Sequence, residues 1–175
     1  PALPDDAQLR ANLLGGEAAL WSEIVDENVI DVRLWPRAFV VAERLWSASG
    51  INDEQNMYQR LASVDSWSAV SVGLQQHAET QLQMMRLANS SDTVALQIFA
   101  QALEPAQFYT RQHLKYQAGH YTQAEPLNRL ADVLPSESNN VRELDRQVDA
   151  LIANRGNRQA ALAIRRQLEQ WRQNI

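Results

Sequence analysis

Residues 13–21 read Leu-Leu-Gly-Gly-Glu-Ala-Ala-Leu-Trp, and this short apolar run, interrupted by a glycine pair, decides how the rest of the chain is interpreted. A run of this length is typical of a buried strand, and glycines within it suit a site where another backbone or a ligand approaches closely. We therefore predict a strand here. Its backbone groups require partner strands, and no later segment has an alternating or β-branched pattern that could supply them. We expect the partner strands upstream of Pro1.

A helix is predicted directly after this strand. Asn28 or Asp31 can begin it, and Pro36 falls within its first turns, where the missing N–H group does little harm. Apolar residues recur along one face of this helix: Val32, Trp35, Phe39, Ala42 and Trp46. We expect Trp35 and Trp46 to be core residues. A strand followed by a helix is the βα unit of a larger sheet.

From about residue 52 the pattern is helical nearly to the end of the chain. The second helix of this region has an apolar stripe made of Leu74, Ala78, Leu82 and Met85. Ser136 or Ser138 can begin a later helix that ends at Asn154, and Asn157 can cap a last one. The stripe of the last helix comprises Ala161, Ile164, Leu168 and Trp171. The tight turn between the two helices predicts an antiparallel αα-hairpin.

The predicted fold class is therefore mainly α, a helical bundle or set of αα-hairpins with about six helices and one N-terminal βα unit. A length of 175 residues excludes a complete (β/α)₈ barrel, which needs roughly 250 residues. The absence of cysteine excludes a disulfide scaffold and a thiolate metal site, and it leaves the cellular compartment open.

Charge and hydropathy argue against nucleic-acid and membrane partners. The formal net charge is −5, and the seven arginines of residues 141–175 alternate with four acidic side chains at helical spacing. This pattern is typical of an ion-paired, solvated helix face, whereas a nucleic-acid groove has denser positive charge and stacking rings. No stretch approaches about 18 uninterrupted apolar residues, and the first twenty residues do not read as a signal peptide.

The N-terminal region resembles the end of the catalytic domain of the β-N-acetylhexosaminidases, the family-twenty glycoside hydrolases. Three segments carry the resemblance, together with Asp26 and Asn28 between the first two: Gly15-Gly16-Glu17-Ala18-Ala19-Leu20-Trp21-Ser22-Glu23, Arg33-Leu34-Trp35-Pro36-Arg37-Ala38 and Ala42-Glu43-Arg44-Leu45-Trp46-Ser47. The resemblance implies that residues 1–50 are the last βα unit of a (β/α)₈ barrel. Residues 51–175 resemble, more diffusely, the helical C-terminal extensions of bacterial members.

The family resemblance also implies a substrate site at Trp21 and Glu23. In the family the matching tryptophan lines the pocket for the terminal N-acetylhexosamine, and the matching carboxylate accepts hydrogen bonds from the distal hydroxyls of that sugar. An indole covers the C–H face of a pyranose, and a carboxylate can accept from two hydroxyls. Glu17 is interpreted as a buried carboxylate outside the site. Arg33, Arg37, Glu43 and Arg44 resemble a structural ion-pair set.

The implied reaction is retaining removal of terminal non-reducing N-acetylhexosamine, as in chitin degradation, with the substrate's own acetamido oxygen as nucleophile. The family's adjacent catalytic Asp-Glu pair lies on an earlier strand, so we expect no catalytic residue in this chain. Asp26-Glu27 and Asp53-Glu54 are adjacent pairs but do not sit at a strand end. No cofactor is expected, and His77, His113 and His120 do not cluster as metal ligands would.

Two functions from different classes remain open at this point. The chain is either the C-terminal part of a β-N-acetylhexosaminidase, acting on N-acetylhexosamine-terminated glycans and packed on upstream barrel residues of the same protein, or a stand-alone helical interaction module. A periplasmic or secreted bacterial enzyme is one reading of the first, and the sequence does not fix the location. We expect the chain by itself to be inactive.

Overall fold

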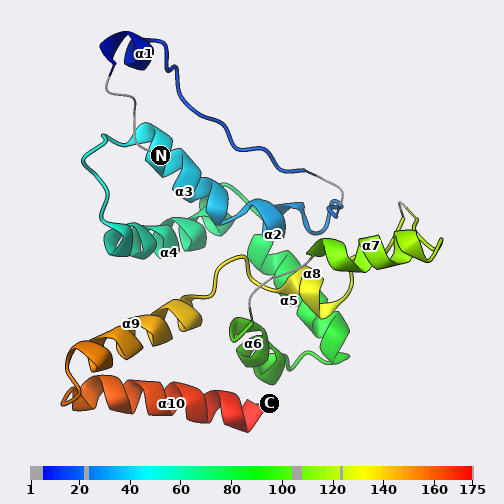
Figure 1. The fold of residues 1–175 in the computed structure, drawn as a ribbon. Coiled ribbons are helices and arrows are strands. Elements are labelled where there is room, and N and C mark those ends of the chain that lie inside the picture. The colour runs from blue at the N-terminus through cyan, green and yellow to red at the C-terminus, as the bar shows by residue number, and fades with distance from the viewer. Residues whose placement is uncertain (1–5, 22–23, 104–107, 123, 175) are drawn as a thin grey trace.

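A computed structural model describes residues 6–21, 24–103, 108–122 and 124–174, and Figure 1 shows that the described chain is a set of packed helices. Its ten helices are α1 (Ala7–Ala11), α2 (Ile30–Leu34), α3 (Arg37–Trp46), α4 (Glu54–Ser71), α5 (Gln76–Ala88), α6 (Val94–Gln101), α7 (Phe108–Gln117), α8 (Leu130–Val133), α9 (Asn139–Ala153) and α10 (Arg158–Asn174). The mainly α class is confirmed. The expected number of about six was too low, because α1 was not predicted and α2 and α3 were predicted as one helix.

Residues 13–21 are extended and exposed, and the described parts of the chain contain no β-strand. The expected strand is therefore not seen here, because a strand is defined by hydrogen bonds to a neighbour that these residues do not contact. One contact fits the glycine pair: a side-chain carbon added at Gly16 would lie 2.9 Å from Leu45 Cδ2 of α3. The segment thus passes very close to α3.

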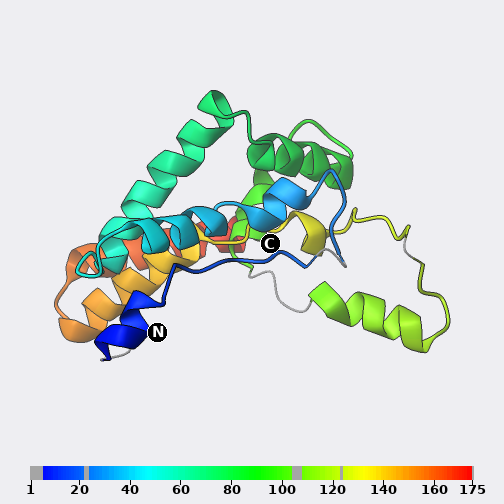
Figure 2. The same cartoon turned by 90° about the horizontal axis from the view of Figure 1, so that it is seen from above.

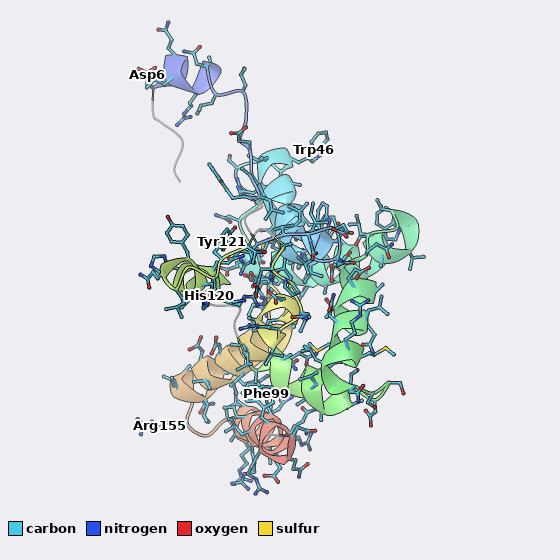
Figure 3. The ribbon with its side chains drawn as sticks, turned by 90° about the vertical axis from the view of Figure 1, so that its right-hand side faces the viewer. Asp6, Trp46, Phe99, His120, Tyr121 and Arg155 are labelled. Atoms are coloured by element: carbon cyan, nitrogen blue, oxygen red, sulfur yellow. The ribbon has the colours of Figure 1, made fainter. Side chains whose placement is uncertain are left out.

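The single helix predicted after the extended segment is in fact two helices, because the helical backbone is interrupted at Trp35 and Pro36. Trp35 has extended backbone angles and ends α2, and the Trp35–Pro36 peptide bond is cis. Pro36 therefore lies between helices and not in a first turn. The expectation that Trp46 is a core residue was also wrong, since its side chain is 93% exposed and points away from the end of α3 (Figure 3).

The buried face of α5 differs from its apolar stripe. Gln76, Gln83 and Met84 are buried, whereas Leu82 is exposed. Burial of Gln76 is possible because its side-chain amide donates to Asp65 Oδ1 at 3.0 Å and to Ser68 Oγ at 3.2 Å in α4. Hydrogen bonding offsets the desolvation of a polar group, so an apolar pattern alone did not identify this face.

Two apolar clusters make up the core of the described residues. The larger joins α5, α6 and α8 through Met84, Ala100, Val133 and Leu134. The smaller joins Ile24 and Val29, just before α2, to Leu127, just before α8. The smaller cluster therefore connects the N-terminal region to a residue about one hundred positions later in the chain.

The predicted C-terminal αα-hairpin is confirmed, and Figures 1 and 2 show α9 and α10 lying side by side and antiparallel. Ser138 Oγ accepts from the Val141 N–H at 3.2 Å and caps α9, and Asn157 Oδ1 accepts from the Ala160 N–H at 3.0 Å and caps α10. Ala160 is the buried residue of α10, whereas Leu168 of the predicted stripe is half exposed.

Helix α2 is held at three successive residues by three parts of the chain downstream of residue 50. Each contact is a hydrogen bond: the Gln75 N–H to the Asp31 carboxylate at 2.7 Å, the Ser136 hydroxyl to the Val32 carbonyl at 2.9 Å, and the Arg33 guanidinium to the Asp132 carboxylate at 3.2 Å. Because neighbouring helical residues point in different directions, these contacts restrain α2 on several sides.

Asp132 in α8, the acceptor in the third of these contacts, is buried. Its side chain is 1% exposed and accepts from Arg33 Nη2, from Arg111 Nη1 at 2.9 Å and Nη2 at 3.1 Å, and from the Arg129 N–H at 2.9 Å. Burial lowers the pKa of Arg33 from its usual value, and the charge of Asp132 opposes that shift. One carboxylate thereby compensates two largely buried guanidinium groups.

Asp132→Ala should lower the free energy of unfolding of the 175-residue chain by about 3–5 kcal/mol, because it removes a buried carboxylate that two largely buried guanidinium groups share. Urea denaturation followed by circular dichroism measures this loss. Glu143→Ala is the matched control, since it removes a partly exposed ion pair to Arg146 within α9 and should leave the midpoint almost unchanged. Equal midpoints for both variants would contradict the central role of Asp132.

Acid should weaken the contact between α3 and α4. Two hydrogen bonds from Arg60, at 2.5 and 3.2 Å, hold the pKa of Glu43 below its ordinary value. A lowered pKa in the folded state means that the contact stabilises the fold above the ordinary pKa of glutamate and that this stabilisation disappears as the pH falls through the lowered value.

Glu43→Gln should therefore flatten the loss of thermal stability between about pH 5 and pH 3. Melting temperatures across this range test the expectation. Glu169→Gln serves for comparison, because hydrogen bonds from Arg172 and Gln173 also lower the pKa of Glu169, so this variant should flatten the profile as well without loosening the α3–α4 contact. A pH profile of Glu43→Gln that matches that of the unmodified chain would refute the assignment.

Candidate functional site

The extended segment 13–21 places Trp21 at its end with an exposed side chain. Trp21 is 74% exposed, which is unusual for an indole and leaves its ring available for contact. Glu23, the second residue of the predicted sugar site, lies outside the described residues. Glu17 is exposed, so the expectation that it is a buried carboxylate was wrong.

A tight turn connects the predicted site to α2. Asp26 Oδ1 accepts from the Asn28 N–H at 2.9 Å and from the Val29 N–H at 3.0 Å, and its backbone carbonyl accepts from Ile30 N–H at 3.1 Å. Ile24 is buried immediately after residues 22–23. The chain therefore passes from an exposed segment into a fixed turn within a few residues.

In each of the two adjacent Asp-Glu pairs, the aspartate has a structural role. Asp26 makes the turn before α2, and Asp53 Oδ1 accepts from the Asn56 N–H at 2.9 Å and caps α4. These contacts occupy the carboxylates with backbone donors, as in ordinary helix starts. Within the ranges that the structure describes, no three side chains of the kinds that bind metals gather as a metal site would require.

The four charged residues that resemble the family's structural ion-pair set each contact a partner elsewhere in the chain. Arg37 donates to Glu137 Oε1 at 2.9 Å and to the Ser136 carbonyl at 2.7 Å. Arg44 donates to the Ile51 carbonyl at 2.6 Å. With Arg33–Asp132 and Glu43–Arg60, this set behaves as the structural group that the sequence suggested.

The sequence alone did not identify Asp132 as a partner of Arg33. Asp132 stands among the apolar residues Leu127, Leu130, Val133 and Leu134. A single acidic residue in such a segment is normally predicted to face solvent. An available signal was the unusual hydrophobicity of its neighbours on both sides, which leaves little room for a solvent-facing position.

A cavity of about 490 Å³, lined by both polar and apolar side chains, lies between the α2–α3 junction, α4, α5, α6 and the start of α9. Its walls include Trp35, Asp65, Gln76, His77, Gln97 and Arg142. His77 Nε2 lies 3.0 Å from Asp65 Oδ2, and Gln97 donates to Gln81 Oε1 at 2.7 Å, so many of the polar groups bind one another. Trp21 does not line this cavity.

None of the helices searched, all within the described ranges, combines the length and the apolar character that a membrane crossing requires.

Sequence comparison supports the resemblance of the N-terminal region. Residues 2–49 match the family model for the catalytic domain of glycosyl hydrolase family 20. The chain is 54% identical over 50 residues to β-hexosaminidase subunit beta of Mus musculus and 52% identical over 48 residues to that of Homo sapiens. It is 50% identical over 52 residues to the chitooligosaccharidolytic β-N-acetylglucosaminidase of Ostrinia furnacalis.

These sequence matches cover only a small part of this chain and of each relative. They cover 29%, 27% and 30% of this chain, respectively, and each spans only 9% of the relative's length.

Structural comparison extends the similarity beyond the N-terminal region. The X-ray structure of Flavobacterium johnsoniae chitobiase matches with a TM-score of 0.80 and 29% sequence identity, over 93% of this chain and 25% of that one. Because the match covers nearly the whole chain, it includes most of the helices downstream of residue 50. Residues 2–49 are thus similar in sequence to the catalytic domain of glycosyl hydrolase family 20, and most of the chain is similar in fold to part of the Flavobacterium johnsoniae chitobiase.

Proposed function

We propose that this chain is the C-terminal part of a β-N-acetylhexosaminidase, called the parent enzyme below, that removes terminal non-reducing N-acetylhexosamine. The observation that carries this proposal is the family-20 match of residues 2–49, supported by about 50% identity to hexosaminidases over the same region. The chitobiase match supports a chitin-derived glycan as one substrate class. The relatives are several times longer than this chain, which is consistent with a larger catalytic unit.

The extended segment becomes the last strand of the parent enzyme's barrel in this proposal. Residues 13–21 supply the strand, α2 and α3 supply the following helix, and together residues 1–50 form the last βα unit. The extended, exposed course of residues 13–21 and the close passage of Gly16 beside Leu45 support this assignment. Residues 51–175 then form a helical extension that covers the outer side of the last barrel helix.

Trp21 and Glu23 bind the terminal sugar in this proposal. An exposed indole at the C-terminal end of the last strand is suitably placed, since substrate pockets of such barrels lie at that end. The indole face covers the apolar face of the pyranose, and the Glu23 carboxylate accepts hydrogen bonds from distal hydroxyls. These contacts orient the sugar and leave the chemical step to other residues.

The chemical step uses groups that lie outside this chain. In substrate-assisted hydrolysis the acetamido oxygen attacks the anomeric carbon, while an acid from the enzyme protonates the leaving oxygen, and water then completes the reaction with retention. The aspartates of both adjacent Asp-Glu pairs here accept backbone hydrogen bonds, which supports placing the catalytic pair elsewhere. The stand-alone module is disfavoured, because α2 is bound at three residues to the later helices and is not a detached remnant.

The isolated 175-residue chain should not hydrolyse a chromogenic N-acetylglucosaminide, because it lacks the general acid. Release of the chromophore by purified chain, compared with a buffer blank, tests this. Turnover that persists through further purification would refute the placement of the catalytic pair.

In the parent enzyme, Glu23→Gln should lose about 1–3 kcal/mol in kcat/KM, the usual contribution of a hydrogen bond to a charged group. Steady-state kinetics on the same substrate give this value. An unchanged kcat/KM would remove Glu23 from the pocket.

Trp21→Ala in the parent enzyme should raise KM about tenfold, because a stacked ring contacts the sugar before and during the reaction. Trp46→Ala is the matched control, since Trp46 is also an exposed tryptophan but stands at the far end of α3. Similar kinetics for the two variants would argue against the sugar site.

A further inference from the structure

We propose that the cavity between the α2–α3 junction, α4, α5, α6 and the start of α9, called the interhelical cavity below, binds a small neutral saccharide. Binding there is additional to the proposed function, because Trp21 does not line the cavity and the proposed hydrolysis uses none of its wall residues. The side chains of the wall that matter for binding are Trp35, Asp65, Gln76, His77, Gln97 and Arg142.

The interhelical cavity has the volume of a small-molecule site. It measures about 490 Å³, and proteins hold ligands of drug size in cavities of about 300–1,000 Å³. Its walls come from stretches that lie far apart in sequence, so its shape is set by the packing of helices and not by a single loop. The side chain of His77 in the wall is 54% exposed, which gives the cavity an edge at the protein surface.

Gln76 has a buried acceptor without a donor. Its Nε2 donates to Asp65 Oδ1 at 3.0 Å and to Ser68 Oγ at 3.2 Å, while the Ser68 hydroxyl donates to the Asp65 carbonyl at 2.7 Å. Both partners accept from the amide, so the reverse orientation would set Oε1 against two acceptors. Gln76 is 5% exposed, and within the described chain its Oε1 has no hydrogen-bond partner. Because a buried carbonyl without a donor is unfavourable, a ligand donor in the cavity stabilises this side chain.

Gln97 in α6 also has an acceptor to offer. Its Nε2 donates to Gln81 Oε1 at 2.7 Å and to Thr93 Oγ1 at 2.7 Å. A side-chain amide has two N–H groups, so both donors of Gln97 are used and its carbonyl oxygen remains as an acceptor. Two glutamines of the wall thus select a ligand that carries hydrogen-bond donors.

The ionisable side chains of the wall already have partners. Glu137 accepts from Arg37 Nε at 2.9 Å and from Arg142 Nη1 at 2.7 Å. Asp65 Oδ2 lies 3.0 Å from His77 Nε2. A charged ligand would have to break one of these pairs, whereas a neutral ligand leaves them in place. The wall therefore favours a neutral ligand.

Trp35 adds an apolar surface to the wall. Its ring packs on Phe39 with the ring centroids 4.2 Å apart, and Phe39 does not line the cavity, so the indole is supported from outside. An indole can cover the C–H face of a sugar ring while acceptors nearby bind the hydroxyls. A saccharide is the neutral ligand class that offers an apolar ring face and several donors together.

Titration of the ¹⁵N-labelled 175-residue chain with the β-1,4-linked disaccharide of N-acetylglucosamine, followed by NMR, tests this proposal. We expect saturable shifts of the Trp35 indole N–H and of the Gln76 side-chain amide, with a dissociation constant on the order of 1 mM. Trp21→Ala should leave these shifts in place. Inorganic phosphate and methylammonium, the charged probes, should not produce them.

Gln76→Met and Gln83→Met make a matched pair, because both residues are buried glutamines of α5, at 5% and 4% exposure, and only Gln76 lines the cavity. Gln76→Met should weaken binding of the disaccharide about tenfold, through the loss of one hydrogen bond. Gln83→Met should change the affinity by less than about twofold. If Gln76→Met does not fold, Gln97→Met takes its place, and the titration of the unmodified chain stands without either variant.

Three results would overturn the saccharide site. The first is the absence of saturable shifts at Trp35 and Gln76 up to about 20 mM disaccharide, which would leave a cavity filled by water only. The second is a set of shifts that disappears in Trp21→Ala, since the disaccharide would then bind at Trp21 as the proposed function expects. The third is stronger binding of phosphate or methylammonium than of the disaccharide at the same resonances.

Discussion

The carboxylate of Asp132, shared by Arg33 and Arg111, is the interaction on which the arrangement of the described helices depends. It joins α2, α7 and α8 at a single buried point, and Asp26 adds a second negative charge near Arg33. A buried guanidinium requires a charged acceptor, and a buried carboxylate requires donors, so neither side tolerates the loss of the other. The apolar clusters around this point supply most of the burial, while the charges specify which segments meet.

Local signals in the sequence predicted the local structure well. Ser138 and Asn157 cap their helices as expected, and the turn at residues 154–157 makes the αα-hairpin, because capping and turn chemistry depend on residues a few positions apart. The apolar pattern predicted burial wrongly where contacts between distant parts of the chain override local preference. Gln76 is buried because Asp65 and Ser68 bind it, and Trp46 is exposed although it continues an apolar stripe.

The candidate site was predictable only through resemblance. Without the family pattern, Trp21 and Glu23 would read as an aromatic and an acid at the end of a short apolar segment. The exposure of Trp21 agrees with a binding role but does not by itself define a ligand. The partner of Arg33 was not predictable, because the charged pair is separated by 99 positions and no periodic pattern relates the two residues.

That separation of 99 residues also orders events during synthesis of the protein. When Arg33 leaves the ribosome, its acceptor has not yet been translated, and at about 5–20 residues per second it follows on the order of 5 to 20 seconds later. During this interval the guanidinium stays hydrated and α2 lacks its buried partner. Helix α2 therefore reaches its final environment only when the nascent chain has grown to α8, which makes the burial of Arg33 a late step of translation.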